Sequence, residues 1–313
     1  MAGSGSSAIS SSTSDSSHTN PLTEGTLMTE LPDTGLNEET GGLVTPYSDG
    51  IPMVSYALVD RDGTILRQYD AERPYYSAST VKVGVMVAAL RELQSGAWRL
   101  DEEKEVTHEF ASILPEAGRF VMRAEETDEG LGVPGDIVTR ARVIERMVTV
   151  SANCATNILF EELGAEKVAQ VFLDAGVPDT GMDRPYSDAA GLEAGVTNRA
   201  SALGLARLMA SLVRGDLLDP EWTEYAKELL RRRENPRISA VATDIAAKTG
   251  GVVDTGSKGG GIDGIAHDFA FVELNGTMYC LGICTRAYTY EQGAAAIQAL
   301  ASALLNDTAI AAR

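Results

Sequence analysis

The stretch RPYYSASTVKVGVMVAAL, residues 73–90, places a serine and a lysine at the start of an apolar run long enough for a buried helix. Ser79 and Lys82 lie one turn apart on one face if the helix begins near Ser79, and the first-turn N–H of Ser79 is then an unpaired donor. The following residues are apolar nearly all round, which is typical of a buried helix. Burial favours the neutral amine of Lys82, which is a base. The stretch therefore predicts a serine nucleophile with an adjacent base.

Composition limits the class of protein. The chain has 313 residues, 44% of them hydrophobic, so it can bury a large core. Its 26 Lys and Arg against 45 Asp and Glu give a net charge of −19, which argues against binding to nucleic acid or to an anionic membrane. Cys154, Cys280 and Cys284 show no metal-ligand spacing and are predicted to be buried free thiols. We expect a monomer without metal or cofactor that binds a small-molecule or peptide substrate.

The N-terminal segment has the composition of a flexible tail. Its first twenty residues contain nine serines and no apolar h-region, so they do not resemble a signal peptide. We predict that residues 1–45 are a tail and linker. No apolar run approaches the length of a membrane span. From the sequence as given, we expect a cytoplasmic protein, or a secreted one if a signal peptide has been removed.

Two β-hairpins are predicted near the ends of the remaining chain. Residues 53–70 contain an Asp-Gly dipeptide between two runs with strand-like patterns. Residues 267–286 contain Asn-Gly in the same kind of position. Both dipeptides suit the positive φ angles of a tight hairpin turn.

The region between the hairpins has helical patterns. Capping residues and hydrophobic periodicity predict helices over residues 139–150, 155–164 and 197–215, and an alanine-rich helix over 291–305. Thr139 is the predicted N-cap of the first of these helices.

This order predicts an α/β protein of the α+β kind, with an antiparallel sheet flanked by helices and an inserted all-helical subdomain. The folded domain is predicted to cover residues 46–313. Residues 46–100 and 241–313 would form the sheet lobe, and residues 101–240 the helical lobe.

Two further motifs stand downstream of Ser79. Ser151 and Asn153 fall at the break between two predicted helices, so a turn would present both side chains. Lys248, Thr249 and Gly250 end a strand-like run shortly before the second hairpin. This lysine is a candidate for a second cation that would lower the pKa of the first.

The order Ser-x-x-Lys, Ser-x-Asn and Lys-Thr-Gly resembles the signature of class A β-lactamases and penicillin-binding-protein-like serine hydrolases. The resemblance covers about residues 46–313. It implies an antiparallel sheet covered by helices, an all-helical lobe, and an active site between them. It also implies a β-lactamase-like hydrolase whose serine is acylated by β-lactams or related amides and esters.

The resemblance also implies residue roles. Ser79 would be the acyl-accepting nucleophile, Lys82 its general base, directly or through water, and Ser151 a proton relay toward the leaving nitrogen. Substrate binding would fall to Asn153, Lys248, Thr249, Gly250 and Gly251, the last through its backbone N–H in an oxyanion hole with the N–H of Ser79.

Two departures from the family pattern stand out. Ala152 replaces the acidic residue of the usual Ser-Asp-Asn turn. The later loop lacks the Glu-x-x-Leu-Asn motif, whose glutamate activates the deacylating water in class A enzymes. Matching MDRPY to the family pattern puts Tyr186 at that place, and Asp183, Asp188 and Glu193 are the other acids nearby. Glu193 is the candidate replacement base, and otherwise deacylation is expected to be slow.

Several alternatives remain open on the sequence. His267, at the start of the second hairpin, is either a structural histidine or a ligand-binding one. The protein is either an enzyme that turns over or a penicillin-binding acyl trap that reacts once. A biosynthetic acyltransferase or cyclase on the same fold is a third possibility.

Overall fold

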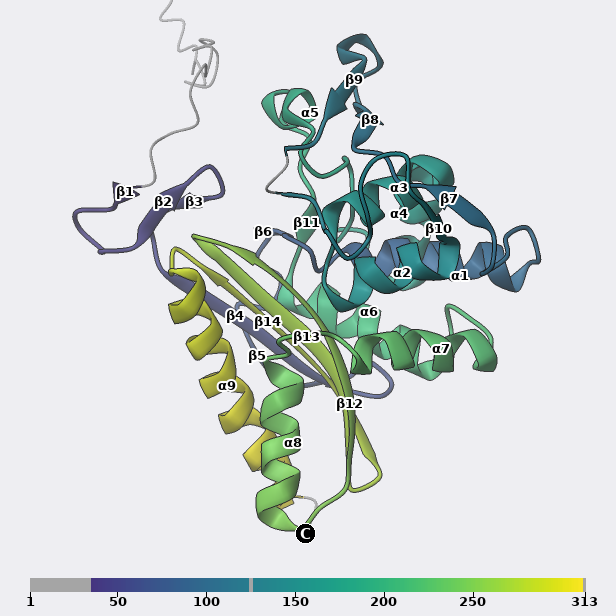
Figure 1. Ribbon diagram of the computed structural model, residues 1–313. Coiled ribbons are helices and arrows are strands. Elements are labelled where there is room, and N and C mark those ends of the chain that lie inside the picture. The colour runs from purple at the N-terminus through teal and green to yellow at the C-terminus, as the bar shows by residue number, and fades with distance from the viewer. Residues whose placement is uncertain (1–34, 124–125, 312–313) are drawn as a thin grey trace, which may run out of the picture. The chain divides into compact units, whose positions relative to one another are not determined.

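A five-stranded antiparallel sheet, built from both ends of the chain, organises the computed structural model (Figure 1). In spatial order its strands are β12 (Val253–Ile262), β13 (Ile265–Leu274), β14 (Thr277–Arg286), β4 (Met53–Asp60) and β5 (Ile65–Tyr69). The structure describes residues 35–123 and 126–311, so the serine-rich segment lies outside the described residues. The predicted sheet of N- and C-terminal segments is confirmed.

Both predicted hairpins are present. Asn275 and Gly276 join β13 to β14 with φ angles of 52° and 82°, and two successive left-handed residues are the requirement of a type I′ turn. In the hairpin of β4 and β5, Gly63 has a φ of 82°, and the carboxylate of Asp60 accepts the N–H of Thr64 at 2.8 Å. Local turn chemistry therefore sets the connection of both strand pairs.

Helices cover both faces of the sheet. On one face lie α8 (Ile238–Thr249) and α9 (Tyr290–Ala311), and on the other lies α6 (Ala202–Arg214) (Figure 1). Side chains alternate between these layers, as the strand geometry requires. Phe269 joins the core on the α6 side, and its neighbour Ala270 joins the core under α8 and α9.

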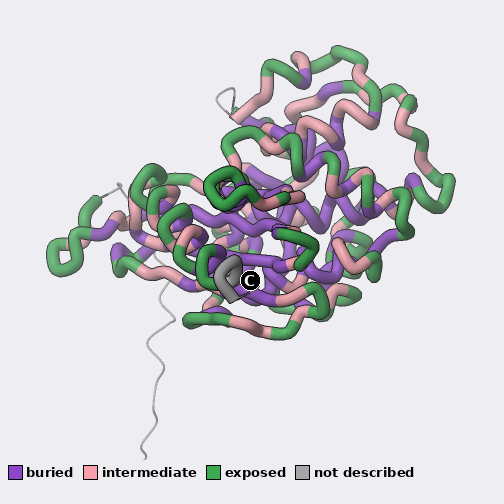
Figure 2. The backbone as a smooth tube through the Cα atoms, turned by 90° about the horizontal axis from the view of Figure 1, so that it is seen from below, coloured by how far each residue is buried: buried purple, intermediate pink, exposed green. Residues whose placement is uncertain are grey.

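The helix α1 (Lys82–Gln94) lies at the centre of the helical part, and ten of its thirteen residues are buried. It packs against α2 (Arg140–Thr149), α3 (Asn153–Leu163), α4 (Ala165–Asp174) and α7 (Pro220–Arg231). Buried segments run through the middle of the molecule, with exposed residues at its periphery (Figure 2). The predicted buried helix is confirmed.

Short elements complete the described chain. A small three-stranded sheet contains β1 (Gly35–Leu36), β2 (Leu43–Thr45) and β3 (Ser48–Asp49). Strand pairs are formed by β6 (Tyr75–Tyr76) with β11 (Arg199–Ala200), β7 (Glu103–Glu105) with β10 (Ile137–Thr139), and β8 (Glu109–Ala111) with β9 (Arg119–Val121). A 3₁₀ helix, η1 (Pro115–Ala117), and α5 (Ala189–Glu193) lie in loops. None of the described helices is long and apolar enough to cross a membrane.

Two details differ from the expectations. The segment predicted as linker contains β1 and β2, because β2 pairs with both of its neighbours. The helix expected to start at Thr197 begins only after Ser201, whose hydroxyl accepts the N–H of Gly204 at 3.0 Å and caps α6. The residues before this cap form β11, which pairs with the strand just before the predicted nucleophile.

The first residue of α2, Arg140, is a buried arginine that binds neighbouring segments. The Arg140 side chain is only 1% exposed and binds Glu162 at 2.6 Å and Glu102 at 2.8 Å. Its guanidinium also lies 3.6 Å from the ring centroid of Trp98. The charge is thus compensated by two carboxylates and an aromatic face.

We expect Arg140→Met to lower the free energy of unfolding by about 3 kcal/mol, because it removes several charge-assisted hydrogen bonds and the stacking partner of a tryptophan. Arg99→Met is the matched control, since Arg99 and Asp101 form an exposed ion pair that solvent screens. Denaturant unfolding of both variants measures the difference. Equal losses would show that the buried network contributes nothing beyond a surface pair.

The same network predicts acid sensitivity. Hydrogen bonds from Lys104 and then from Arg140 lower the pKa of Glu102 to about 2. A carboxylate with a depressed folded pKa stabilises the fold above its unfolded pKa, and this contribution is lost as the pH falls toward 2. In Arg140→Met, the part of the acid-induced loss in the free energy of unfolding that comes from Glu102 is expected to be smaller than in the wild type.

Candidate active site

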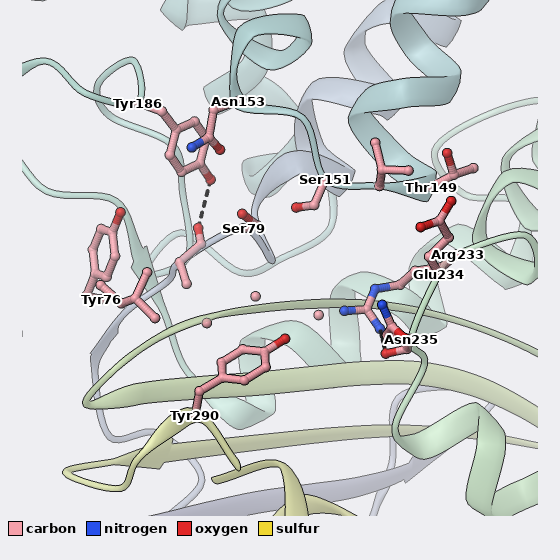
Figure 3. A pocket seen from close by; sticks show the side chains of 16 residues that line it. Tyr76, Ser79, Thr149, Ser151, Asn153, Tyr186, Arg233, Glu234, Asn235 and Tyr290 are labelled. Carbon is pink, nitrogen blue, oxygen red and sulfur yellow. Dashed lines mark hydrogen bonds between the residues drawn. The ribbon is translucent and has the colours of Figure 1, made fainter. Parts of the chain in front are cut away.

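A pocket of about 330 Å³ lies beside β12, between the sheet and the helices (Figure 3). Its lining comes from Tyr76, Ala78 and Ser79 before α1, Thr149, Val150, Ser151 and Asn153 between α2 and α3, Tyr186, residues 233–235 after α7, residues 259–262 of β12, and Tyr290 of α9. The predicted nucleophile therefore shares one cavity with the predicted Ser-x-Asn turn.

Ser79 lies half-buried in the tight turn that leads into α1. The strand β12 passes directly against this turn at Gly260. A Cβ on Gly260 would lie 2.3 Å from the Ser79 backbone nitrogen and 3.0 Å from the Cβ of Ala78. Only glycine permits this approach, so the absence of a side chain brings β12 to the backbone of the nucleophile.

Lys82 is the first residue of α1 and is fully buried. Its Nζ lies 2.5 Å from the Ser151 carbonyl oxygen, 2.6 Å from Asn153 Oδ1 and 3.4 Å from Ser151 Oγ. Burial lowers the pKa of the Lys82 ammonium well below its ordinary value. A neutral amine donates two hydrogens, one to each close oxygen, and keeps a lone pair free to accept a proton.

Ser151 occupies the turn between α2 and α3 in a left-handed conformation, with a φ of 67°. Ala152 follows as the N-cap position of α3, and its buried methyl group stands where the family carries an acid. The turn nevertheless presents both neighbouring side chains to the pocket. The replacement of the acid thus removes a carboxylate and leaves the predicted Ser151 and Asn153 in place.

Lys258, which the sequence reasoning missed, is a second lysine in contact with the Ser151 side chain. Its fully buried Nζ donates to Ser151 Oγ at 2.8 Å and to the Gly259 carbonyl at 2.8 Å. Burial, and then the charges of Arg233 and Lys82, lower its pKa well below the ordinary value. The signal was a lysine followed by three glycines in a strand, since strand glycines mark a close backbone approach.

The Lys-Thr-Gly motif chosen on sequence is not part of the pocket. Lys248 and Thr249 form the exposed last turn of helix α8, and Gly250 ends it in the left-handed conformation with a φ of 68°. The Gly251 N–H donates to the Ala246 carbonyl at 2.9 Å, so it is used in capping the helix. These residues precede β12, whereas the pocket lies at the other end of that strand.

Tyr186 enters the pocket from the loop after α4 and is 5% exposed. Asn157 holds its backbone by two hydrogen bonds of 2.9 Å, one to its N–H and one to its carbonyl. The Tyr186 hydroxyl donates to the Ala78 carbonyl at 2.7 Å, and Lys82 Nζ lies 4.5 Å from the ring centroid. Burial raises the pKa of Tyr186 well above its ordinary value, so the phenol stays protonated.

The acids considered as replacement bases do not line the pocket. Glu193 is exposed at the end of α5. Asp188 caps that helix and accepts the Ser112 hydroxyl at 2.9 Å, and Asp183 pairs with Arg199 at 2.9 Å. The expectation that Glu193 could be the base is therefore not supported by its position.

His267 is a buried structural histidine behind the pocket wall. Its Nε2 lies 2.9 Å from the Tyr76 carbonyl oxygen, and its Nδ1 lies 2.7 Å from the Ala266 carbonyl oxygen and 3.2 Å from the Thr285 nitrogen. Burial lowers its pKa to about 4, so the ring is neutral and carries one N–H. The histidine thereby holds the strand that carries Tyr76.

A second missed residue, Arg233, adds a cation at the β12 wall. Its side chain is 8% exposed, and its Nη1 donates to the Asn235 carbonyl at 2.9 Å. The same nitrogen lies 3.7 Å from the carboxylate of the buried Asp268. A Cβ on Gly259 would lie 2.6 Å from Arg233 Nη2, so this glycine leaves room for the guanidinium. Arg233 therefore makes this wall of the pocket suitable for an anion, whereas Lys258 is fully buried and does not line the pocket.

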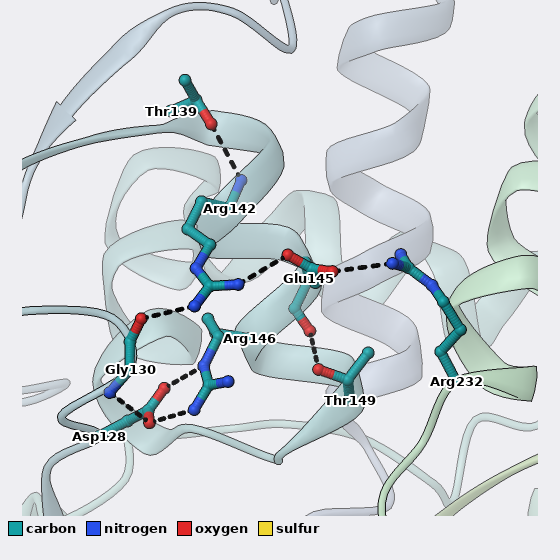
Figure 4. A network of polar contacts seen from close by, with 8 residues as sticks. All are labelled: Asp128, Gly130, Thr139, Arg142, Glu145, Arg146, Thr149 and Arg232. Carbon is teal, nitrogen blue, oxygen red and sulfur yellow. Dashed lines mark hydrogen bonds and ion pairs between the residues drawn. The ribbon is translucent and has the colours of Figure 1, made fainter.

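A polar network fixes the turn that carries Ser151 (Figure 4). Thr149 donates to the Glu145 carbonyl at 2.9 Å within the last turn of α2. The Glu145 carboxylate binds Arg142 at 3.0 Å and Arg232 at 2.8 Å. Because Arg232 follows α7, these ion pairs join α2 to the start of the pocket segment 233–235.

Comparisons with known proteins agree with this architecture. The model of the Beta-lactamase enzyme family matches residues 43–308. A β-lactamase from Sphaerobacter thermophilus is 21% identical, with a TM-score of 0.69 over 83% of this chain and 92% of that one. A class A β-lactamase from Mycobacterium abscessus is 18% identical, with a TM-score of 0.66 over 82% and 94%. PBP-A is 22% identical, with a TM-score of 0.65 over 82% and 90%, and a mutant of it was solved as an acyl-enzyme complex with penicillin G. No curated protein matches the chain.

Proposed function

Because the chain belongs to the β-lactamase enzyme family, we propose that Ser79 is acylated by β-lactams or related amides and esters, and that the acyl-enzyme hydrolyses slowly. The observation that carries this proposal is the Ser151 hydroxyl. It contacts two buried lysine amines, Lys258 at 2.8 Å and Lys82 at 3.4 Å, and it lines the same pocket as Ser79. Such an arrangement supplies a base for the nucleophile and a proton path for the leaving group.

Acylation begins with the neutral amine of Lys82. Its two N–H groups donate to the Ser151 carbonyl and to Asn153, so its lone pair takes the Ser79 hydroxyl proton. The Ser79 Oγ then bonds to the substrate carbonyl carbon. The developing oxyanion is stabilised by the N–H of Ser79 and by that of Gly261, which follows the close contact at Gly260.

Cleavage of the carbon–nitrogen bond requires a proton on the leaving nitrogen. Ser151 gives its hydroxyl proton to that nitrogen and receives one from the Lys82 ammonium. The proton removed from Ser79 thus ends on the leaving group, and Lys82 returns to its neutral form. Lys258, which donates to the same hydroxyl, orients it toward the pocket.

The substrate is proposed to carry a carboxylate. Arg233 brings a positive charge to the β12 wall of the pocket. A bound carboxylate there would favour the protonated form of the buried Lys258 amine, because an anion compensates a charge that burial otherwise disfavours. Asn153 faces the same pocket and is proposed to bind the substrate amide. This assignment moves carboxylate binding from the Lys-Thr-Gly motif to β12.

Deacylation is proposed to be slow because the loop after α4, where class A enzymes carry the deacylating glutamate, contributes no carboxylate to the described lining of the pocket. Among the described residues that line the pocket, Glu234 is the one that carries a carboxylate, and it lies in the segment after α7. The loop after α4 contributes Tyr186, and its protonated phenol does not activate water. The same feature supports a second candidate, an acyl trap that reacts once.

Intact-mass spectrometry after mixing with a penicillin or a chromogenic cephalosporin tests the proposal. We expect an adduct of the full β-lactam mass that persists for minutes, with weak hydrolysis after a burst. The adduct is expected in the control Ser95→Ala, at the exposed far end of α1, and absent in Ser79→Ala.

Other outcomes of this experiment are equally informative. No adduct together with no hydrolysis would reject β-lactams as substrates. Rapid turnover without an accumulating adduct would reject slow deacylation. An adduct that never decays would identify the acyl trap.

A further inference from the structure

The residue before the nucleophile has a strained backbone. Ala78 has a φ of 46°, in the left-handed region that residues with a Cβ disfavour, and it is 4% exposed. Its conformation sets the direction in which the chain enters Ser79. Strain of this kind persists only where surrounding contacts hold it.

Two hydroxyls hold this turn through the Ala78 carbonyl. Ser77 Oγ donates from the neighbouring residue at 3.0 Å, and the Tyr186 hydroxyl donates at 2.7 Å from 108 residues away (Figure 3). The backbone of the tyrosine is itself held in place, because the Asn157 side-chain amide binds both its N–H and its carbonyl. The loop after α4 is therefore joined to the turn by one phenol.

The chemistry of this phenol limits its role. It is buried and protonated, and Lys82 Nζ lies 4.5 Å from its ring centroid, so it donates a hydrogen bond and does not act as a base. Its hydroxyl proton is committed to the Ala78 carbonyl, so toward the Ser79 side chain, which it also contacts, the phenol oxygen acts only as an acceptor.

We propose that Tyr186 is a positioning residue whose hydroxyl holds the left-handed turn at Ala78 and so orients Ser79 for acylation. The inference rests on the proposed function in taking Ser79 as the nucleophile, and it does not depend on β-lactams being the substrate. It assigns the loop after α4 a role in the first chemical step.

Tyr186→Phe keeps the ring and removes only the hydroxyl. We expect the maximal acylation rate of Ser79 to fall about tenfold, the size of one lost hydrogen bond, while the concentration for half-maximal rate is unchanged. Amide hydrogen exchange in residues 77–81 is expected to accelerate, because the strained turn opens more often.

Tyr75→Phe is the matched control. Tyr75 is also 5% exposed, and its hydroxyl also makes a 2.7 Å hydrogen bond, to Ser55. Removing it is expected to lower the unfolding temperature about as much as Tyr186→Phe, without the loss of acylation rate. This comparison separates a positioning role from a general loss of stability.

A rescue variant tests the backbone argument directly. Glycine adopts a φ of 46° without the steric cost of a Cβ. Ala78→Gly combined with Tyr186→Phe is therefore expected to recover part of the acylation rate that Tyr186→Phe alone loses. Failure of the double variant to exceed Tyr186→Phe would overturn the proposal.

The reaction is followed with a fluorophosphonate, whose phosphorus bonds to an activated serine oxygen as fluoride leaves, and in parallel with a penicillin. Labelling of the wild type by the fluorophosphonate alone would reject the β-lactam function and leave this inference testable. Equal rates and equal exchange in wild type and Tyr186→Phe would overturn the inference alone. No labelling of the wild type by either probe would overturn both.

Discussion

Replacing Lys82 by alanine is expected to reduce acylation of Ser79 by about a thousandfold, with carboxylate-bearing and neutral substrates alike. The amine is the group proposed to take the hydroxyl proton, because in its neutral form two N–H groups are used by Ser151 and Asn153 and the lone pair remains free. Pre-steady-state kinetics, read as adduct mass against time, measures the loss. Retained acylation would place the base elsewhere.

The pH profile separates loss of the base from loss of packing. Wild-type acylation requires neutral Lys82, so its rate falls as the pH drops through the folded pKa of that amine. Burial lowers this pKa, so the acid limb lies well below the range of an ordinary lysine. Lys82→Met keeps most of the side-chain volume and is expected to show a low rate without this limb.

The second large effect is expected at Lys258. Lys258→Ala should weaken recognition of carboxylate-bearing substrates by about a hundredfold, because it removes the amine that is proposed to become protonated and pair with the substrate anion when that anion binds. Neutral esters should lose less, since for them the change only removes a donor to the Ser151 hydroxyl. The ratio of kcat/KM, or of acylation efficiencies, for a matched acid and ester measures the difference.

Lys248→Ala is the control for this comparison, because it deletes the same side chain from the exposed end of α8. We expect it to change neither substrate by more than about twofold. Equal losses for acid and ester in Lys258→Ala would reject the carboxylate role. A selective loss in Lys248→Ala would reject the assignment of the site to β12.

The sequence predicted the elements that local chemistry controls. The hairpin turn at Asn275 needs only two residues with positive φ, and Thr139 caps α2 by accepting a hydrogen bond from within the first helical turn. The buried α1 followed from its unbroken apolar composition. Each of these features is decided within a few residues, where propensity and hydrophobic pattern act directly.

The site was predicted in part for the same reason. The Ser79 and Lys82 spacing is a property of one turn and one helix, and the break before Asn153 is visible as the end of a helical pattern. The prediction that Lys248 ends a strand was wrong, because a three-residue sequence match does not specify secondary structure. Those letters form the end of α8, where Gly250 caps the helix, and the strand lysine is Lys258.

The sequence by itself determined the sheet's hairpins, the buried helix, and the placement of Ser79 and Lys82 at its start, since these depend on neighbours along the chain. Only the tertiary structure decided that Lys258 meets Ser151 and that Tyr186 holds the Ala78 carbonyl, contacts between residues about a hundred positions apart. Such contacts depend on the packing of whole helices and strands, and on glycines such as Gly260 that let two backbones approach. A local sequence pattern does not predict which distant segments will contact each other, because the free energy that favours those contacts comes from burying the entire core.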